Sequence, residues 1–166
     1  MKKSLLLFGF CVIQICAYAQ ISAREILKQK IDNDLKEIIS SSPSLTGLMA
    51  IDLTSGETIG FNSDGVFTQA SAIKIPILME VYKQANEKKF ALTDIKPLLP
   101  VNTVAGSGIL NSMTDPVNLS IRNYCMLMIG LSDNSATNTL IELVGMKNVT
   151  DTMLSLGFLN TKLQRK

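Results

Sequence analysis

The stretch from Phe67 to Glu80 constrains the fold most, because a loop gives way there to a long apolar helix. It reads Phe-Thr-Gln-Ala-Ser-Ala-Ile-Lys-Ile-Pro-Ile-Leu-Met-Glu, and the helix after Ser71 is expected to run to about Lys89. Pro76 falls within its early turns and would remove one backbone hydrogen bond. We expect a modest cost near the helix start and no break.

The chain before this stretch predicts a helix followed by an antiparallel hairpin. Apolar residues recur with helical spacing from Ala23 to Ser42, and Pro43 ends the pattern. Two extended runs follow, Leu45 to Leu53 and Glu57 to Asn62. The short connection Thr54-Ser55-Gly56 between them is typical of a hairpin turn.

After the central helix, the pattern predicts one irregular segment and three further helices. Residues 91 to 118 contain several prolines and glycines and are expected to be loop-rich. Helices are expected at Leu119 to Leu131, at Asn134 to Val144 and at Met146 to Leu156. The order of helix, hairpin and several helices is an α+β pattern, and the length allows a single domain.

Residues 1–19 have the pattern of a secretory signal peptide. Two lysines precede an apolar run from Leu5 to Ile15, and Ala17-Tyr18-Ala19 forms a small-x-small cleavage site. The run is shorter than the about 20 residues that span a membrane. Cys16 allows a lipoprotein reading, but the residues before it are not the small ones such a site prefers. We expect export to a bacterial periplasm without a membrane anchor.

The composition excludes several kinds of chemistry. The chain contains no histidine, so a Ser-His-Asp triad is impossible, and we expect no metal site and no cofactor. Without Lys2 and Lys3, 14 of the 16 basic residues remain against 14 acidic ones, so nothing suggests nucleic-acid binding. Cys125 is the single cysteine after the signal and is expected to be a small buried hydrophobic residue.

Ser71 and Lys74 are the first candidate for chemistry. Residues three apart on a helix lie within side-chain reach. A serine hydroxyl needs an adjacent base to act as a nucleophile, and a lysine can be that base if burial lowers its pKa. Ser-x-x-Lys is common by chance, so the pair alone does not establish a function.

Ser132-Asp133-Asn134 lies between two predicted helices and is the second candidate. All three residue types also favour turns and helix N-caps, so capping is the alternative explanation. Ser-x-x-Lys followed some sixty residues later by Ser-Asp-Asn resembles the class A β-lactamases. The flanking residues that also match are Phe67, Ala70, Pro76, the run Gly106-Ser-Gly-Ile-Leu110, Asp115-Pro116, Met128-Ile129, Ala136-Thr-Asn138 and Gly157.

The resemblance covers residues 23 to 166 and implies a β-lactamase/transpeptidase-like fold. It also implies hydrolysis of the β-lactam amide of penicillins or cephalosporins through a serine acyl-enzyme, the chemistry of antibiotic resistance. Ser71 would be the acylated nucleophile, Lys74 would help remove its proton, and Ser132 would relay a proton toward the lactam nitrogen. Asn134 would bind the substrate, and the backbone N–H of Ser71 would form half of an oxyanion hole.

Two further residues, Asp133 and Asn138, are expected to fix the loop that presents Ser132 and Asn134. The family's deacylating glutamate and its Lys-Thr-Gly or Lys-Ser-Gly strand find no match up to Lys166. The resemblance therefore implies that residues 20–166 are the N-terminal part of a catalytic domain, without its C-terminal strands. We expect this chain alone to be poorly folded and not to turn over β-lactams.

Two other functions stay open within the same superfamily. One is a D,D-peptidase or penicillin-binding protein, and the other is a sensor domain that is acylated by β-lactams without releasing them. In each case the partner is a small β-lactam or related molecule, with no nucleic acid and no membrane anchor. The full-length protein is expected to be a monomer.

Overall fold

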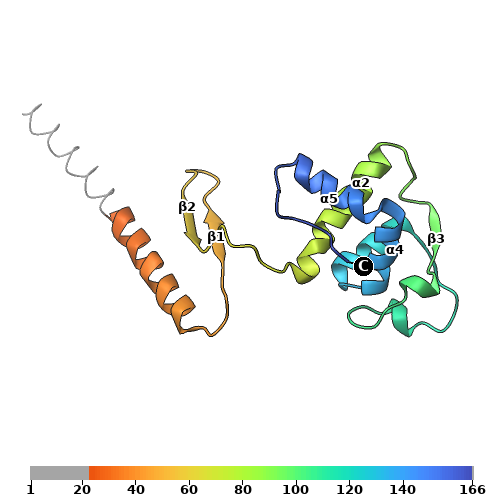
Figure 1. Cartoon of the computed structure of the whole chain (residues 1–166), viewed down its shortest axis with the longest axis horizontal. Helices are drawn as coiled ribbons and strands as arrows, with labels where there is room; N and C mark the ends of the chain where they lie inside the picture. The colour runs from red at the N-terminus through yellow and green to blue at the C-terminus, as the bar shows by residue number, and fades with distance from the viewer. Residues whose placement is uncertain (1–22, 166) are drawn as a thin grey trace, which may run out of the picture. The chain divides into compact units, whose positions relative to one another are not determined.

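The structure is a computed structural model that describes residues 23–165 (Figure 1). The predicted signal peptide, residues 1–19, lies outside the described residues. The chain divides into two units, Met1–Phe67 and Thr68–Lys166. Helices and two small antiparallel sheets make up the described part, so the α+β class predicted from the sequence is confirmed.

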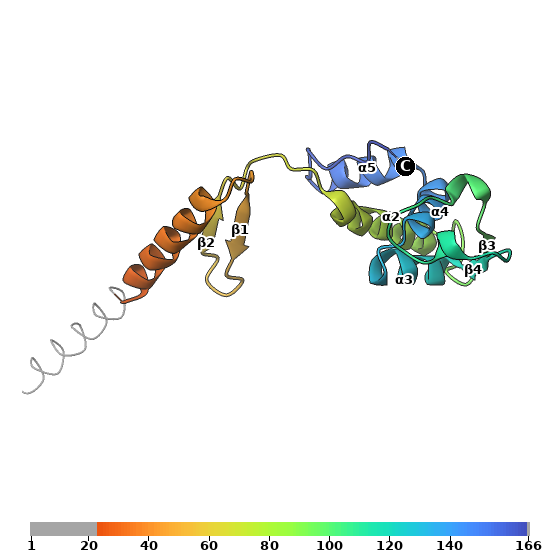
Figure 2. The same ribbon diagram turned by 90° about the horizontal axis from the view of Figure 1, so that it is seen from below.

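The first unit contains the predicted helix and hairpin (Figure 2). Residues 23–41 are helical. Strand β1 (Leu48–Ile51) pairs with β2 (Thr58–Phe61), with Leu48 opposite Phe61 and Ile51 opposite Thr58. Both strands are shorter than predicted. At the hairpin turn the ladder stops because Asp52 turns the chain by accepting a hydrogen bond from the backbone N–H of Thr54.

Apolar side chains of the first unit are largely exposed. Met49 is 60% exposed, Ile51 52% and Leu53 94%, and Ile26 and Ile38 on the helix are exposed as well. Isolated two-stranded sheets are marginally stable in water because they bury little apolar surface. The first unit therefore has little hydrophobic core of its own.

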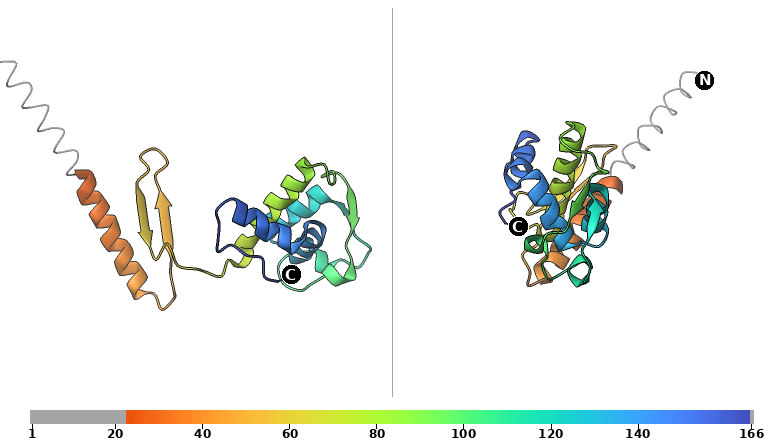
Figure 3. Two further views of the ribbon diagram at one scale, coloured as in Figure 1. Left: turned by 45° about the horizontal axis from the view of Figure 1, so that its top comes forward. Right: turned by 90° about the vertical axis from the view of Figure 1, so that its right-hand side faces the viewer.

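The second unit is a bundle of helices (Figure 3). It contains α2 (Lys74–Asn86), α3 (Ile121–Gly130), α4 (Asn134–Val144) and α5 (Met146–Ser155). Helix α4 packs against each of the other three. The buried core includes Ile77 and Val81 of α2, Ile121, Tyr124 and Met128 of α3, Leu140 and Val144 of α4, and Val149 of α5.

A small sheet and three short 3₁₀ turns were not predicted from the sequence. Strand β3 (Ile95–Pro97) pairs antiparallel with β4 (Asn118–Ser120), so the ends of the segment predicted as irregular are joined. The 3₁₀ turns η2 (Pro100–Asn102) and η3 (Leu110–Ser112) lie between these strands. The third turn, η1 (Ala70–Ile73), precedes α2. Because Ser120 caps α3 by accepting from the N–H of Asn123, α3 begins at Ile121 and not at Leu119.

The central helix also begins and ends differently from the prediction. Ala70–Ile73 forms the 3₁₀ turn η1, and α2 begins at Lys74. Pro76 therefore lies in the first turn of α2, where backbone N–H groups have no intrahelical acceptor, and removes no α-helical bond. The helix ends at Asn86 because Lys88 adopts φ +61° while Lys88 and Lys89 donate to Ala85 and Gln84, which is a Schellman ending.

A buried polar network connects α2 with α4 and α5. The carboxylate of Glu80, 1% exposed, accepts from Thr152 Oγ1 at 2.5 Å and from Gln84 Nε2 at 2.7 Å. Gln84 Nε2 also donates to the carbonyl of Val144 at 2.9 Å. Because a buried carboxylate is costly unless it is hydrogen-bonded, this network fixes how the three helices pack.

Candidate active site

Ser71 lies on η1, directly before α2, as the sequence predicts for a residue at a helix start. Its side chain is exposed, whereas Lys74 one turn later is 5% exposed. The preceding residue Ala70 has φ +44°, a left-handed conformation that is unfavourable for a residue with a Cβ. Such strain is frequent at functional sites, where it aims a side chain.

Lys74 is the centre of the candidate site. Its amine nitrogen lies 2.6 Å from the carbonyl oxygen of Ser132, 2.8 Å from Ser132 Oγ and 3.0 Å from Asn134 Oδ1. Ser71 Oγ is 3.5 Å from the same nitrogen and 2.9 Å from Ser132 Oγ. The structure thus brings together all four residues predicted for the site.

Burial of Lys74 lowers the pKa of its amine, because desolvation disfavours the charged ammonium, while the nearby charge of Asp133 acts in the opposite direction. A neutral amine has two N–H donors and one lone pair. The carbonyl of Ser132 and Oδ1 of Asn134 can only accept, so they use the two donors. The lone pair is then available to a hydroxyl of Ser71 or Ser132.

Ser132 is held in a strained conformation on the turn between α3 and α4, with φ +52°. Asp133 follows as the N-cap of α4 and accepts from the N–H of Ala136 at 2.8 Å. Its second oxygen accepts from the N–H groups of Ile109 and Leu110 at 2.7 and 3.0 Å. Asp133 therefore fixes this turn, as predicted, by binding the 106–110 segment. It also caps α4, so helix capping and a role in the candidate site are both compatible with the geometry.

Close packing explains the two glycines of the 106–110 segment. Gly108 has φ +112°, and a Cβ there would lie 2.1 Å from Asp133 Oδ2 and 2.5 Å from the Cα of Asp133. A Cβ on Gly106 would lie 2.6 Å from Asn134 Nδ2. The Gly-x-Gly spacing is thus the sequence signal for the contact between this segment and Ser132-Asp133-Asn134.

The side chain of Asn134 contacts Lys74 through only one of its two polar atoms. Its Oδ1 accepts from Lys74, whereas Nδ2 has no hydrogen-bond partner among residues 23–165. Asn138, 8% exposed, was expected to fix the 132–134 turn, but within the described part of the chain its side chain makes no hydrogen bond to that turn. Asp133 makes the contacts that fix this turn. The hydroxyl of Ser135 bonds to the backbone of Val104 and so connects α4 to the segment before Gly106, a contact that the sequence did not predict.

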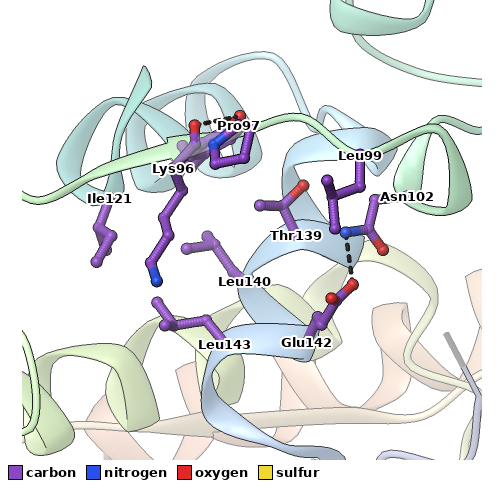
Figure 4. Close-up of a pocket in the computed structure, with 10 residues that line it drawn as sticks. Lys96, Pro97, Leu99, Asn102, Ile121, Thr139, Leu140, Glu142 and Leu143 are labelled. Carbon is purple, nitrogen blue, oxygen red and sulfur yellow. Dashed lines mark hydrogen bonds between the residues drawn. The ribbon is translucent and has the colours of Figure 1, made fainter. Parts of the chain in front are cut away.

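A pocket of about 370 Å³ lies elsewhere in the second unit, between α4, α3 and β3 (Figure 4). Its polar lining includes Lys96, Asn102 and Glu142, and its apolar lining includes Leu140 and Leu143. None of Ser71, Lys74, Ser132 and Asn134 lines it, so it is separate from the candidate site. Residues 23–165 contain no cluster of three or more potential metal ligands, and none of their helices has both the length and the hydrophobicity of a membrane span.

Comparison with known proteins matches residues 30–166 to the β-lactamase enzyme family. The chain is 25% identical to β-lactamase SME-1 of Serratia marcescens, in a match that covers 99% of this chain and 55% of that protein. A β-lactamase structure from Sphaerobacter thermophilus is 38% identical with a TM-score of 0.69, covering 72% of this chain and 45% of that chain.

A third similar structure is a mutant of PBP-A in an acyl-enzyme complex with penicillin G. It is 28% identical with a TM-score of 0.77, and the match covers 82% of this chain and 53% of that chain. The chain thus spans about half the length of these relatives. The structural matches confirm the β-lactamase/transpeptidase-like fold predicted from the sequence. The family match extends over most of the sequence and agrees with the fold, and the chain belongs to the β-lactamase enzyme family, with a class A-like sequence.

Proposed function

We propose that Ser71 is the nucleophile of a serine β-lactamase and that Lys74 is the base that activates it. The observation that carries this proposal is the buried amine of Lys74 in contact with the hydroxyls of both Ser71 and Ser132. General bases contribute when they lie within hydrogen-bond reach of the proton they remove. Here the base, the nucleophile and a second hydroxyl lie within 3.5 Å of one another.

In the proposed reaction, Ser71 Oγ attacks the lactam carbonyl carbon while the amine of Lys74 takes the hydroxyl proton. The C–N bond of the lactam then breaks, and the leaving nitrogen receives a proton through Ser132 Oγ, which Lys74 reprotonates. The product is an ester between Ser71 and the ring-opened β-lactam, with every atom of the substrate retained. Hydrolysis of this ester would return Ser71 and release the open acid.

Substrate binding is assigned to Asn134 and to the backbone of Ser71. The unpaired Nδ2 of Asn134 can donate to an amide carbonyl of the substrate. The N–H of Ser71, at the start of the η1–α2 helix, would stabilise the oxyanion that forms on the lactam carbonyl. The acyl-enzyme complex of the structurally similar PBP-A mutant with penicillin G supports the acylation step, and the two binding roles rest on the geometry of this chain.

A penicillin-binding protein or a non-hydrolysing sensor is the second candidate, because PBP-A is among the similar structures. Both candidates share the acylation step and differ in whether the ester is hydrolysed. We further propose that residues 1–19 direct export to the periplasm. We also propose that hydrolysis needs groups other than those found in residues 20–166.

The test is intact-mass spectrometry of the protein encoded by the gene that contains this sequence, after mixing with benzylpenicillin. We expect the protein mass to increase by one whole penicillin molecule, and we expect this adduct to disappear as the substrate is consumed. A persistent adduct would instead favour the penicillin-binding or sensor function. Absence of any adduct on the folded protein would contradict the acylation role of Ser71.

A further inference from the structure

The segment from Thr103 to Ser107, here called the rim loop, borders the candidate site beside Asn134. The backbone N–H of Asn134 donates to the carbonyl of Ser107 at 2.9 Å. A Cβ on Gly106 would lie 2.6 Å from Asn134 Nδ2, the atom proposed to bind substrate. All five residues of the rim loop are exposed. A substrate bound at Asn134 therefore lies next to this loop.

Ser135 fixes Val104, the second residue of the rim loop, to α4. Its hydroxyl, on a residue that is 1% exposed, accepts from the N–H of Val104 at 3.1 Å and donates to the carbonyl of Val104 at 3.3 Å. One side chain thus satisfies both backbone groups of a single loop residue. An exposed loop without regular structure has few other ways to hold a fixed backbone position.

A second contact holds the start of the loop to the same face of α4. Asn102 Nδ2 donates to Glu142 Oε2 at 2.6 Å, and Asn102 is 1% exposed (Figure 4). Ser135 and Glu142 are seven residues apart and therefore lie on one face of the helix, two turns from each other. Asn102 Oδ1 has no hydrogen-bond partner in the described part of the chain, so the bond from Nδ2 to Glu142 is the side-chain contact that holds this residue to α4.

We propose that Ser135 is a positioning residue that sets the place of the rim loop beside Asn134 and thereby the affinity for the substrate side chain. The inference rests on the function proposed above. Ser135 contacts none of Ser71, Lys74 and Ser132 through its hydroxyl, so removing that hydroxyl changes substrate binding and leaves the acylation step intact. If the hydroxyl of Ser135 only stabilised the fold, its removal would lower thermal stability but would not change substrate binding and acylation differently.

The experiment compares Ser135→Ala with Thr139→Ala in the protein encoded by the gene that contains this sequence. Thr139 is also buried on α4, but its hydroxyl donates within the helix, to the carbonyl of Ser135 at 2.9 Å. Stopped-flow acylation by a chromogenic cephalosporin separates the dissociation constant of the encounter complex from the limiting acylation rate. For Ser135→Ala we expect the dissociation constant to rise about three- to tenfold, as for loss of one hydrogen bond, with the limiting rate changed less than about twofold.

Three further tests distinguish positioning from stability if Ser135→Ala is also less stable. Amide hydrogen exchange at Val104 is expected to accelerate in Ser135→Ala and not in Thr139→Ala, and Ser135→Thr, which retains the hydroxyl, is expected to restore binding. Asn102→Ala is expected to weaken binding in the same direction. An unchanged dissociation constant in Ser135→Ala, or an equal change in Thr139→Ala, overturns the positioning role alone. Absence of acylation in the unsubstituted protein overturns the proposed function and this inference together.

Discussion

Two physical effects act in opposite directions on the pKa of the Lys74 amine. Burial disfavours the ammonium and lowers the pKa of the amine, and the buried carboxylate of Asp133 favours the ammonium. The carboxylate is itself occupied by three backbone N–H groups and makes no direct ion pair with Lys74. Desolvation is therefore the larger effect, and the amine is better suited to accept a proton than a lysine on the surface.

Replacing Lys74 by arginine tests the role of the amine as a base. Arginine keeps the positive charge but stays protonated at all accessible pH values. We expect the acylation rate of Lys74→Arg to fall by about a hundredfold or more, the usual contribution of a general base. The control is Lys147→Arg on the surface of α5, for which stopped-flow acylation should show no change. An active Lys74→Arg variant would contradict a base role for this residue.

The lowered pKa of Lys74 predicts how acylation depends on pH. Because only the neutral amine accepts the proton, the acylation rate should rise with pH and reach half its maximum below the ordinary lysine pKa of about 10.4. Over the same window the unfolded chain binds this proton more tightly than the folded one, so the unfolding free energy contributed by Lys74 also rises with pH. A rate that is flat through neutral and alkaline pH would argue against Lys74 as the titrating base.

At the scale of secondary-structure elements, the turn before α4 depends on close contact with the Gly106–Leu110 segment. Gly108→Ala would place a Cβ on the backbone and carboxylate of Asp133, a clash that no rotamer change relieves. The matched control is Gly56→Ala in the hairpin turn, where φ is also positive, +73°, and nothing lies within 4 Å.

The two glycine variants should therefore differ in stability. Gly56→Ala is expected to cost about 1 kcal/mol, the penalty for a left-handed residue alone. Gly108→Ala is expected to cost at least about 3 kcal/mol, because overpacking against Asp133 is added to the penalty of a positive φ. Chemical denaturation measures both, and equal losses would show that the contact with Asp133 does not constrain this turn.

Elements with strong periodic or capping signals were predictable from the sequence, whereas those fixed by tertiary pairing were not. Helix α4 has its predicted bounds, Asn134 to Val144, because Asp133 and Gly145 cap it. Strand β3 was missed because three residues carry no period, and its partner β4 lies more than twenty residues away. The contacts of Ser135 and Glu80 were missed for the same reason, since nothing local indicates the distant partner of a buried polar group.

At the scale of the whole molecule, the two units differ in how much apolar surface they bury. Thirteen hydrophobic side chains form the buried core of the described chain, and all of them belong to the second unit. We therefore expect the 166-residue chain alone to protect the amides of α2 and α4 from hydrogen exchange far better than those of β1 and β2. Equal protection of the hairpin would show that its strands are stabilised by contacts that burial does not reveal.

The same chain is expected not to hydrolyse penicillin, because no carboxylate of the described residues lies among the contacts of Ser71, Lys74 and Ser132 to activate a deacylating water. Penicillin consumption followed by ultraviolet absorbance measures this directly. Rapid turnover by the purified 166-residue chain would contradict this prediction.

The central claim is that Ser71 is the acylated nucleophile, and locating the adduct tests it most directly. In the protein encoded by the gene that contains this sequence, trypsin releases Ser71 in the peptide from Glu37 to Lys74, whereas Ser132 lies in the peptide from Asn123 to Lys147. After brief exposure to benzylpenicillin and quenching in acid, we predict the adduct on Ser71 in the first peptide and its complete loss in Ser71→Ala. An adduct on Ser132, or one that persists in Ser71→Ala, would contradict the claim.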